Sequence, residues 1–227
     1  MNRPFEVYES KDKIALRRVL FAIELLDAVT LDRVSQGVEV KAHGLQGKPI
    51  VNAGGLFVWL DEDIRQLERI SIDPRILPYE EVKLEGNQLQ LPLTAIELPP
   101  RVDYPFTIGI TGLRGTLVEE LGRLEPVLYT EVHLRWLDRD GIWHDAPTRS
   151  HTRAASTTTK GGDFVAILRL APTDDPQLDA NGKLTVRVRF KRGDNERSSG
   201  ELQVLQGRVA SPLTPNQFVF AWGELEP

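Results

Sequence analysis

The stretch NAGGLFVWLDED, residues 52–63, has the order of residue types expected where a tight turn leads into a buried β-strand. Asn and Gly tolerate the positive φ angles that tight turns require, and here they precede the apolar run LFVWL. A continuous apolar run bounded by turn residues indicates a strand that is covered on both faces. We therefore place residues 56–60 across the middle of a hydrophobic core, with Trp59 inside it.

The second half of the chain repeats this order in TTTKGGDFVAILRLAP, residues 157–172. The segments before the two stretches also correspond, namely IELLDAVTLDRVSQGVEVKAHG (23–44) and GLRGTLVEELGRLEPVLYTEVHLRW (112–136). In each half a strand runs into an acidic turn, a loop leads to an alternating strand, and a polar turn with glycines opens the apolar strand. Such self-similarity predicts two structural units of the same kind.

Short β-strands are predicted along the rest of the chain. Alternation of apolar and polar residues marks 37–42, 69–74 and 87–98, the last of these around Leu89, Leu91 and Leu93. Hairpins are expected over 131–147 and 179–209, with RGDNERSSG at the tip of the second, and a last strand is expected over 217–225. The one helical candidate is DEDIRQLER (61–69). The predicted fold class is therefore all-β, with two tandem antiparallel β-sandwich domains.

The proline-rich segment ELPPRVDYPF, residues 97–106, is a stiff connector and sets the expected domain boundary. We expect an N-terminal tail over 1–13, a first sandwich over 14–100, and a second sandwich with a C-terminal tail over 101–227. MNRPFEVYESKD and FAWGELEP, at the two ends, place aromatic residues beside charges. Both ends are therefore predicted to dock onto partners.

Composition narrows the classes of function. The formal net charge is −5, so no excess of cations is available for nucleic acid or for an anionic membrane. The chain has no cysteine, which excludes disulfides, thiolate zinc sites and cysteine nucleophiles and favours the cytoplasm. The apolar run 19–26 is short and interrupted by Glu24, which predicts a buried strand. We expect synthesis in the cytoplasm without a signal peptide, followed by incorporation into a particle.

The segment DAVTLDRVSQGVEV (27–40), followed by a loop and NAGGLFVWL (52–60), resembles the carboxypeptidase regulatory-like, or transthyretin-like, β-sandwich family. The resemblance is best over residues 16–76 and looser over 110–192. It implies a sandwich of the seven-stranded type that serves as a structural, carrier or adhesion module. It carries over no catalytic residue.

Two groups of side chains are candidates for surface binding. Trp143, next to His144 and Asp145, is the best candidate for an exposed sugar-stacking ring. Cations gather on the second hairpin and form either a solvated face or a docking site for an acidic partner. These cations are Arg187, Arg189, Lys191, Arg192 and Arg197. The tripeptide RGD (192–194) at the predicted tip has two interpretations, a cell-attachment motif or an ordinary turn.

Catalytic and metal sites have weaker signals. In one interpretation, His133 and His144 face the same side of their hairpin and form a metal or general-base site with Asp145. In the other, they are isolated surface histidines. The acids at 61–63 and 174–175 offer oxygen ligands for calcium without the helical-loop spacing. G-x-S-x-G and phosphate-binding glycine loops do not occur. We therefore expect no catalytic residue, no bound metal and no cofactor.

These observations favour a non-enzymatic structural or interaction protein whose partners are other protein subunits of an assembly. Phage-tail-like and contractile-injection-type particles are assemblies that such modules suit. The alternatives are a carbohydrate- or cell-surface-binding module, with a glycan as partner, and a metal-dependent enzyme. No partner among nucleic acids is expected, and no insertion into a membrane.

Overall fold

The computed structural model describes residues 5–8, 14–60, 66–123, 125–152, 161–212 and 218–227. Within these ranges the regular structure is β-strand, together with short 3-10 turns such as η2 (Gly86–Gln88) and η3 (Trp222–Glu224). No helix in this part of the chain is long and apolar enough to cross a membrane. The predicted all-β class is confirmed. The fold divides into two compact units, Met1–Leu98 and Pro99–Pro227.

The first unit has a four-stranded and a three-stranded sheet. The four-stranded sheet has the order β5 (Ile50–Val51), β6 (Phe57–Leu60), β3 (Val19–Asp27) and β9 (Leu93–Leu98). The three-stranded sheet has the order β4 (Glu39–His43), β7 (Arg69–Asp73) and β8 (Val82–Glu85). A separate hairpin is formed by β1 (Phe5–Tyr8) and β2 (Ile14–Arg17).

The core of the first unit confirms the placement of the 56–60 stretch. Trp59 on β6 is 1% exposed and stacks on Phe21 of β3, with ring centroids 4.6 Å apart and planes 9° apart. Ile70 and Ile72 of β7 are fully buried in the second sheet. Leu60 is only half-buried, so the far face of β6 is less covered than the continuous apolar run predicted.

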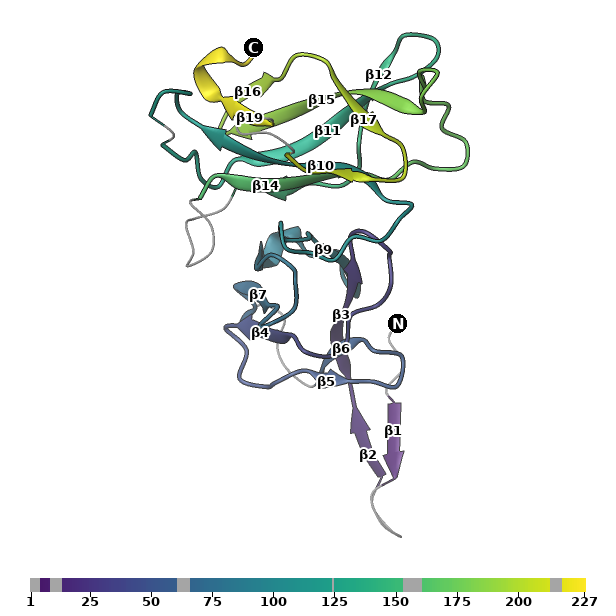
Figure 1. The fold of residues 1–227 in the computed structure, drawn as a ribbon. Helices are drawn as coiled ribbons and strands as arrows, with labels where there is room; N and C mark the ends of the chain where they lie inside the picture. The colour runs from purple at the N-terminus through teal and green to yellow at the C-terminus, as the bar shows by residue number, and fades with distance from the viewer. Residues whose placement is uncertain (1–4, 9–13, 61–65, 124, 153–160, 213–217) are drawn as a thin grey trace. The chain divides into compact units, whose positions relative to one another are not determined.

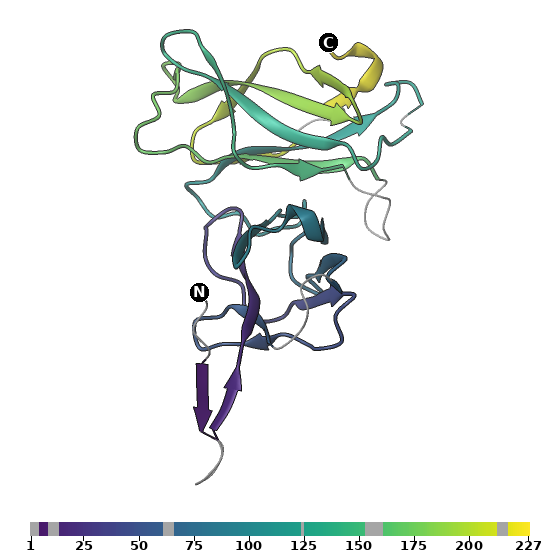
Figure 2. The same ribbon diagram turned by 180° about the vertical axis from the view of Figure 1, so that it is seen from behind.

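The second unit is a sandwich of a four-stranded and a six-stranded sheet, seen as two layers in Figure 1 and, from behind, in Figure 2. The smaller sheet contains β10 (Thr111–Val118), β14 (Asp163–Leu168), β18 (Val209–Ala210) and β19 (Val219–Ala221). The larger contains β11 (Glu131–Leu137), β12 (Trp143–Asp145), β13 (Ser150–His151), β15 (Lys183–Arg192), β16 (Asn195–Ser198) and β17 (Leu202–Leu205). The predicted alternation on β15 is confirmed, because its inward residues are all fully buried, namely Leu184, Val186, Val188 and Phe190.

The strand pairings of the two units correspond. In the first unit β3 pairs antiparallel with β6 and parallel with β9, and in the second β10 pairs antiparallel with β14 and parallel with β18 and β19. In the other sheets β4 pairs with β7 and β7 with β8, just as β11 pairs with β15 and β15 with β16 and β17. The repeat recognised in the sequence is thus present in the topology.

The correspondence extends to single backbone bonds after the first strand. The amide of Val34 donates to the carbonyl of Leu25 at 2.8 Å, and the amide of Val127 donates to that of Leu117 at 3.0 Å. The chain therefore folds back onto the end of the first strand in both units. The register of the apolar strands agrees with this alignment, since Phe57 lies opposite Ile23 and Phe164 opposite Gly115.

A buried carboxylate terminates β3. Asp27 is 4% exposed, and its Oδ1 accepts hydrogen bonds from the amides of Val29 (2.6 Å) and Thr30 (3.2 Å). The hydroxyl of Tyr79 donates to its Oδ2 at 2.8 Å. Burial and the bond to Asp27 raise the pKa of Tyr79 above its usual range, so the phenol stays protonated as a donor.

Several details differ from the sequence predictions. The four-stranded sheet of each unit is mixed rather than purely antiparallel, because β9, β18 and β19 run parallel to their neighbours. In the segment 87–98 only β9 forms, and Leu91 and Leu93 are 51% and 46% exposed while Ile96 and Leu98 are buried. A shift of one residue in the alternation exchanges the two faces of a strand. The predicted helix at 61–69 lies largely outside the described residues, and Arg69 begins β7.

The ends and the tip of the second hairpin also differ. The predicted tail at 1–13 contains β1. The C-terminal segment is not a free tail, because Phe220 and Leu225 are each 8% exposed and the backbone of Glu226 pairs with Ser198. The predicted nine-residue tip is wrong, since β16 begins at Asn195 and only two residues, 193–194, connect it to β15.

Replacing Trp59 by alanine should destabilise the first unit by about 3–5 kcal/mol, the usual loss for a buried large aromatic side chain. Phe164→Ala, at a fully buried ring of the second unit, is the matched variant. Calorimetry should resolve two unfolding transitions, each variant lowering a different one. A single transition that both variants lower equally would show that the units do not unfold separately.

Gly162→Ala should cost several times more stability than Gly141→Ala. Both glycines have positive φ, 74° and 79°, so the backbone penalty of about 1 kcal/mol is shared. A Cβ at Gly162 would lie 2.3 Å from the carbonyl oxygen of Leu117, whereas a Cβ at Gly141 meets nothing within 4 Å. Urea denaturation of the two variants measures the difference, and equal losses would contradict the close approach.

Candidate functional site

The outward face of the six-stranded sheet carries most of the binding residues predicted from the sequence. Because side chains alternate along a strand, the buried residues of β11 and β15 force their neighbours to the opposite face. We call this surface the outer charged face. It consists of Glu131, His133, Arg135, Trp143, Asp145, Arg149, Arg187, Arg189, Lys191, Glu196 and Glu201.

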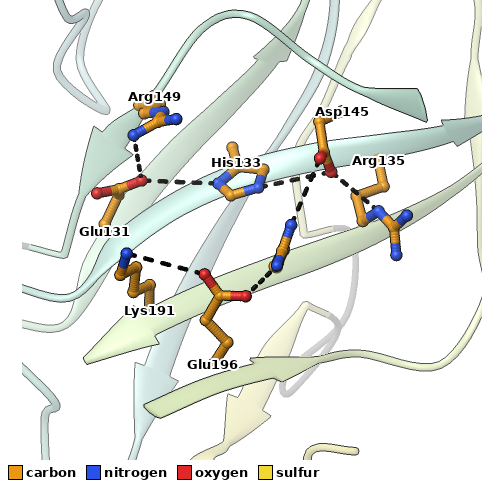
Figure 3. Close-up of polar contacts among 8 residues, drawn as sticks. Glu131, His133, Arg135, Asp145, Arg149, Lys191 and Glu196 are labelled. Atoms are coloured by element: carbon orange, nitrogen blue, oxygen red, sulfur yellow. Dashed lines mark hydrogen bonds and ion pairs between the residues drawn. The ribbon is translucent and has the colours of Figure 1, made fainter. Parts of the chain in front are cut away.

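Acids and bases alternate across this face and neutralise one another, as Figure 3 shows. Arg189 lies between two carboxylates, Asp145 at 3.4 Å and Glu196. Asp145 is shared with Arg135, whose Nε lies 2.9 Å from Oδ1. On the other side, Nη1 of Arg149 lies 3.0 Å from Oε1 of Glu131. The result is two groups of ion pairs, with His133 between them.

Each cation of the predicted row has an acidic or carbonyl partner in the structure. Arg187 pairs with Glu201 at 3.2 Å. Arg192 does not join the outer charged face, because it forms an ion pair with Glu119 at 2.7 Å. Arg197 donates to the carbonyl oxygen of Trp222 at 2.7 Å. The cations to which an acidic protein would bind are therefore already paired within the chain.

Trp143 is not an open stacking platform. Its side chain is half-buried, and the guanidinium carbons of Arg187 and Arg135 lie 4.8 and 6.0 Å from its ring centroid. A sugar ring would have to displace an arginine that is held by cation–π attraction and by its ion pairs.

His144 lies on the other side of its strand from Trp143 and Asp145. Its ring stacks on Trp136, with centroids 4.7 Å apart, and its Nε2 lies 2.7 Å from Oδ2 of Asp138. This bond lowers the pKa of Asp138. The expectation that His133 and His144 face one side is wrong, because β12 pairs His144 with Trp136 and Asp145 with Arg135.

A shallow pocket of about 190 Å³ lies beside His144, between the loops that follow β11 and β14. Its lining is acidic and aromatic, with one arginine: Trp136, Asp138, Arg139, Asp140, His144, Thr173, Asp174 and Asp175. Within the described ranges no three His, Asp or Glu side chains converge in a way that would hold a metal ion. The proposed calcium ligands at 61–63 lie outside those ranges.

His133 is the residue of this face whose burial the sequence did not predict. It was expected at the surface, yet it is 6% exposed, because the long charged side chains around it cover the ring. Its Nδ1 lies 4.0 Å from Oε1 of Glu131 and its Nε2 3.8 Å from Oδ1 of Asp145, both longer than hydrogen bonds. In the described part of the chain Nδ1 has no hydrogen-bond partner.

The environment of His133 lowers its pKa. Burial is the main cause, and Arg189 and Arg149 add to it, while Asp145 and Glu131 act in the opposite direction. A neutral imidazole is thus the form that the folded state favours. The arrangement is a surface of paired charges around a neutral histidine.

Because the pKa of His133 is lower in the folded than in the unfolded chain, the second unit should lose stability as the pH falls below about 6.5. The unfolded state takes up the proton first, and the loss ends once the folded-state pKa has been passed. His133→Gln should flatten the pH dependence of the melting temperature in this window. His144→Gln should leave the slope due to His133 in place. An unchanged slope in His133→Gln would contradict the assignment.

No protein-family model matches this chain, and neither does any curated protein or solved structure. The resemblance to the carboxypeptidase regulatory-like family therefore stays an expectation that rests on the residues 27–60 and their turn-and-strand pattern. The topology described above is compatible with a sandwich module of this kind and does not depend on the family assignment.

Proposed function

We propose that this chain is a structural subunit that joins a larger protein assembly through its β1–β2 hairpin. The observation that carries the proposal is that β1 and β2 are paired only with each other in the described part of the chain. An isolated two-stranded hairpin is marginal in water and needs a further strand or a packed face to become stable. A partner would supply what the hairpin lacks.

The sequence of the hairpin supports a docking role. The register pairs Phe5 with Arg17, Val7 with Ala15 and Tyr8 with Ile14. Six of the eight residues in its two strands are apolar, namely Phe5, Val7, Tyr8, Ile14, Ala15 and Leu16, and the other two are Glu6 and Arg17. A strand pair of this composition is suited to a contact that buries apolar residues.

The other end of the chain does not share this role. The segment 219–226 supplies β19 to the smaller sheet and pairs with Ser198, so the second unit uses it for its own fold. Docking is therefore assigned to the N-terminal hairpin alone. In this proposal the chain is a non-enzymatic building block, and particles of the phage-tail or contractile-injection kind remain the type of assembly that we favour.

Fractionation by size of extracts from cells that make the protein tests this proposal. The tagged wild-type chain should sediment with a heavy particle, and Ile14→Asp/Leu16→Asp should shift to the mass of a single chain, because two charges cannot be buried at the contact. Thr185→Asp/Gln203→Asp adds the same charge to the second unit and should stay in the heavy fraction. A wild-type chain that sediments alone would overturn the proposal.

A further inference from the structure

We infer that the hairpin of one copy docks on the β5 edge of a second copy, so that the chain assembles with itself. This inference rests on the proposed function and names the partner. It depends on three features of the first unit: a sheet edge with half-exposed apolar residues, a hairpin of mostly apolar sequence, and the separation of the two along the chain.

The acceptor is the outer strand of the four-stranded sheet. Among the described residues, β5 is paired with β6 alone. Its two residues, Ile50 and Val51, are 53% and 47% exposed. Consecutive residues of a strand point to opposite faces, so each face of the sheet ends in an apolar side chain. Unpaired strand edges that carry apolar residues are templates for pairing with another chain.

The hairpin complements this edge. Six of its eight strand residues are apolar, as are both residues of β5, so a hairpin added beside β5 would join apolar residues to apolar residues. Pro49 precedes the edge and offers no backbone N–H, which limits the shared ladder to a few bonds. Most of the affinity must therefore come from burial of the apolar side chains.

Within one copy the hairpin extends from β3, which is paired on both sides at Ala22 and Ile23. Arg18 alone separates β2 from β3, and β3 already lies between β6 and β9. β5 lies beyond β6 and is level with Ala22 and Ile23 of β3. Arg17 precedes Ala22 by five residues, roughly 16 Å along an extended chain. A second copy meets the edge without this constraint.

In the part of the second unit that the structure describes, no strands correspond to β1 and β2, and β12 and β13 pair with β11 instead of forming an edge beside β14. There the hydroxyl of Ser150 donates to the carbonyl of Val165 on β14 at 2.5 Å. The β1–β2 hairpin and the β5 edge are thus additions to the repeat, and both occur in the first unit.

A hairpin and an edge at different places on the same chain form a head-to-tail contact. Such contacts give a ring if the rotation closes and a filament if it does not. The purified full-length chain should therefore associate in a concentration-dependent way in sedimentation experiments. Ile50→Glu/Val51→Glu should sediment as a single chain. Leu91→Glu/Leu93→Glu changes two leucines of similar exposure in the same unit and should associate as the wild type does.

Because the chain has no cysteine, single cysteines can be introduced without background. Ala15→Cys mixed with Val51→Cys and treated with a short bis-maleimide should give several-fold more cross-linked dimer than Ala15→Cys mixed with Gln203→Cys. Equal yields would overturn the inference, as would a purified wild-type chain that stays single at every concentration. If that chain still enters a heavy particle in cells, the proposed function stands and the partner is a different protein.

Discussion

The central position of the first strand constrains the rest of each unit. β3 and β10 use both of their edges, with an antiparallel neighbour on one side and a parallel neighbour on the other. A parallel partner cannot follow directly in sequence, so the chain must build the second sheet before it returns to the first. The order of strands in both units follows from this requirement. The backbone bonds to Leu25 and Leu117 fix where the first strand ends and the connection begins.

The turn that opens the apolar strand depends on the same strand. Gly162 lies so close to the Leu117 carbonyl that a side chain cannot be accommodated, and a Cβ at Gly55 would lie 2.9 Å from Arg33 Cδ, in the segment that folds back on β3. The glycine therefore serves both the turn and the packing of the turn against its neighbour. This double requirement explains why the turn-and-strand pattern of 52–60 returns at 161–167 although most other residues differ.

Alternation predicted the inward face of β15 correctly because a buried face admits only apolar residues. The alternation gave the wrong face at 87–98. There Leu89, Leu91 and Leu93 form one alternating series, and the residues from Thr94 to Leu98 form another that is shifted by one position. Pairing with β3, which is distant in sequence, selects between them. The sequence predicted which residues of β15 belong to the outer charged face, but it did not predict the ion pairs that they form. The partners of Arg189 come from β12 and β16, and neighbours across strands do not follow from a linear pattern.

Comparison of the two units distinguishes the strands that the fold requires from the strands that it does not require. Strands that occur in both units, including β9 and β19 at their ends, are required to complete the two sheets. Among the described residues the β1–β2 hairpin and the β5 edge occur in the first unit and have no counterpart in the second, and the core around Trp59 and Phe21 is built by other strands. A hairpin that pairs with no further described strand, and an edge with half-exposed apolar residues, call for another role. Association between copies accounts for both with one contact, which is why we assign them to each other and not to two unrelated partners.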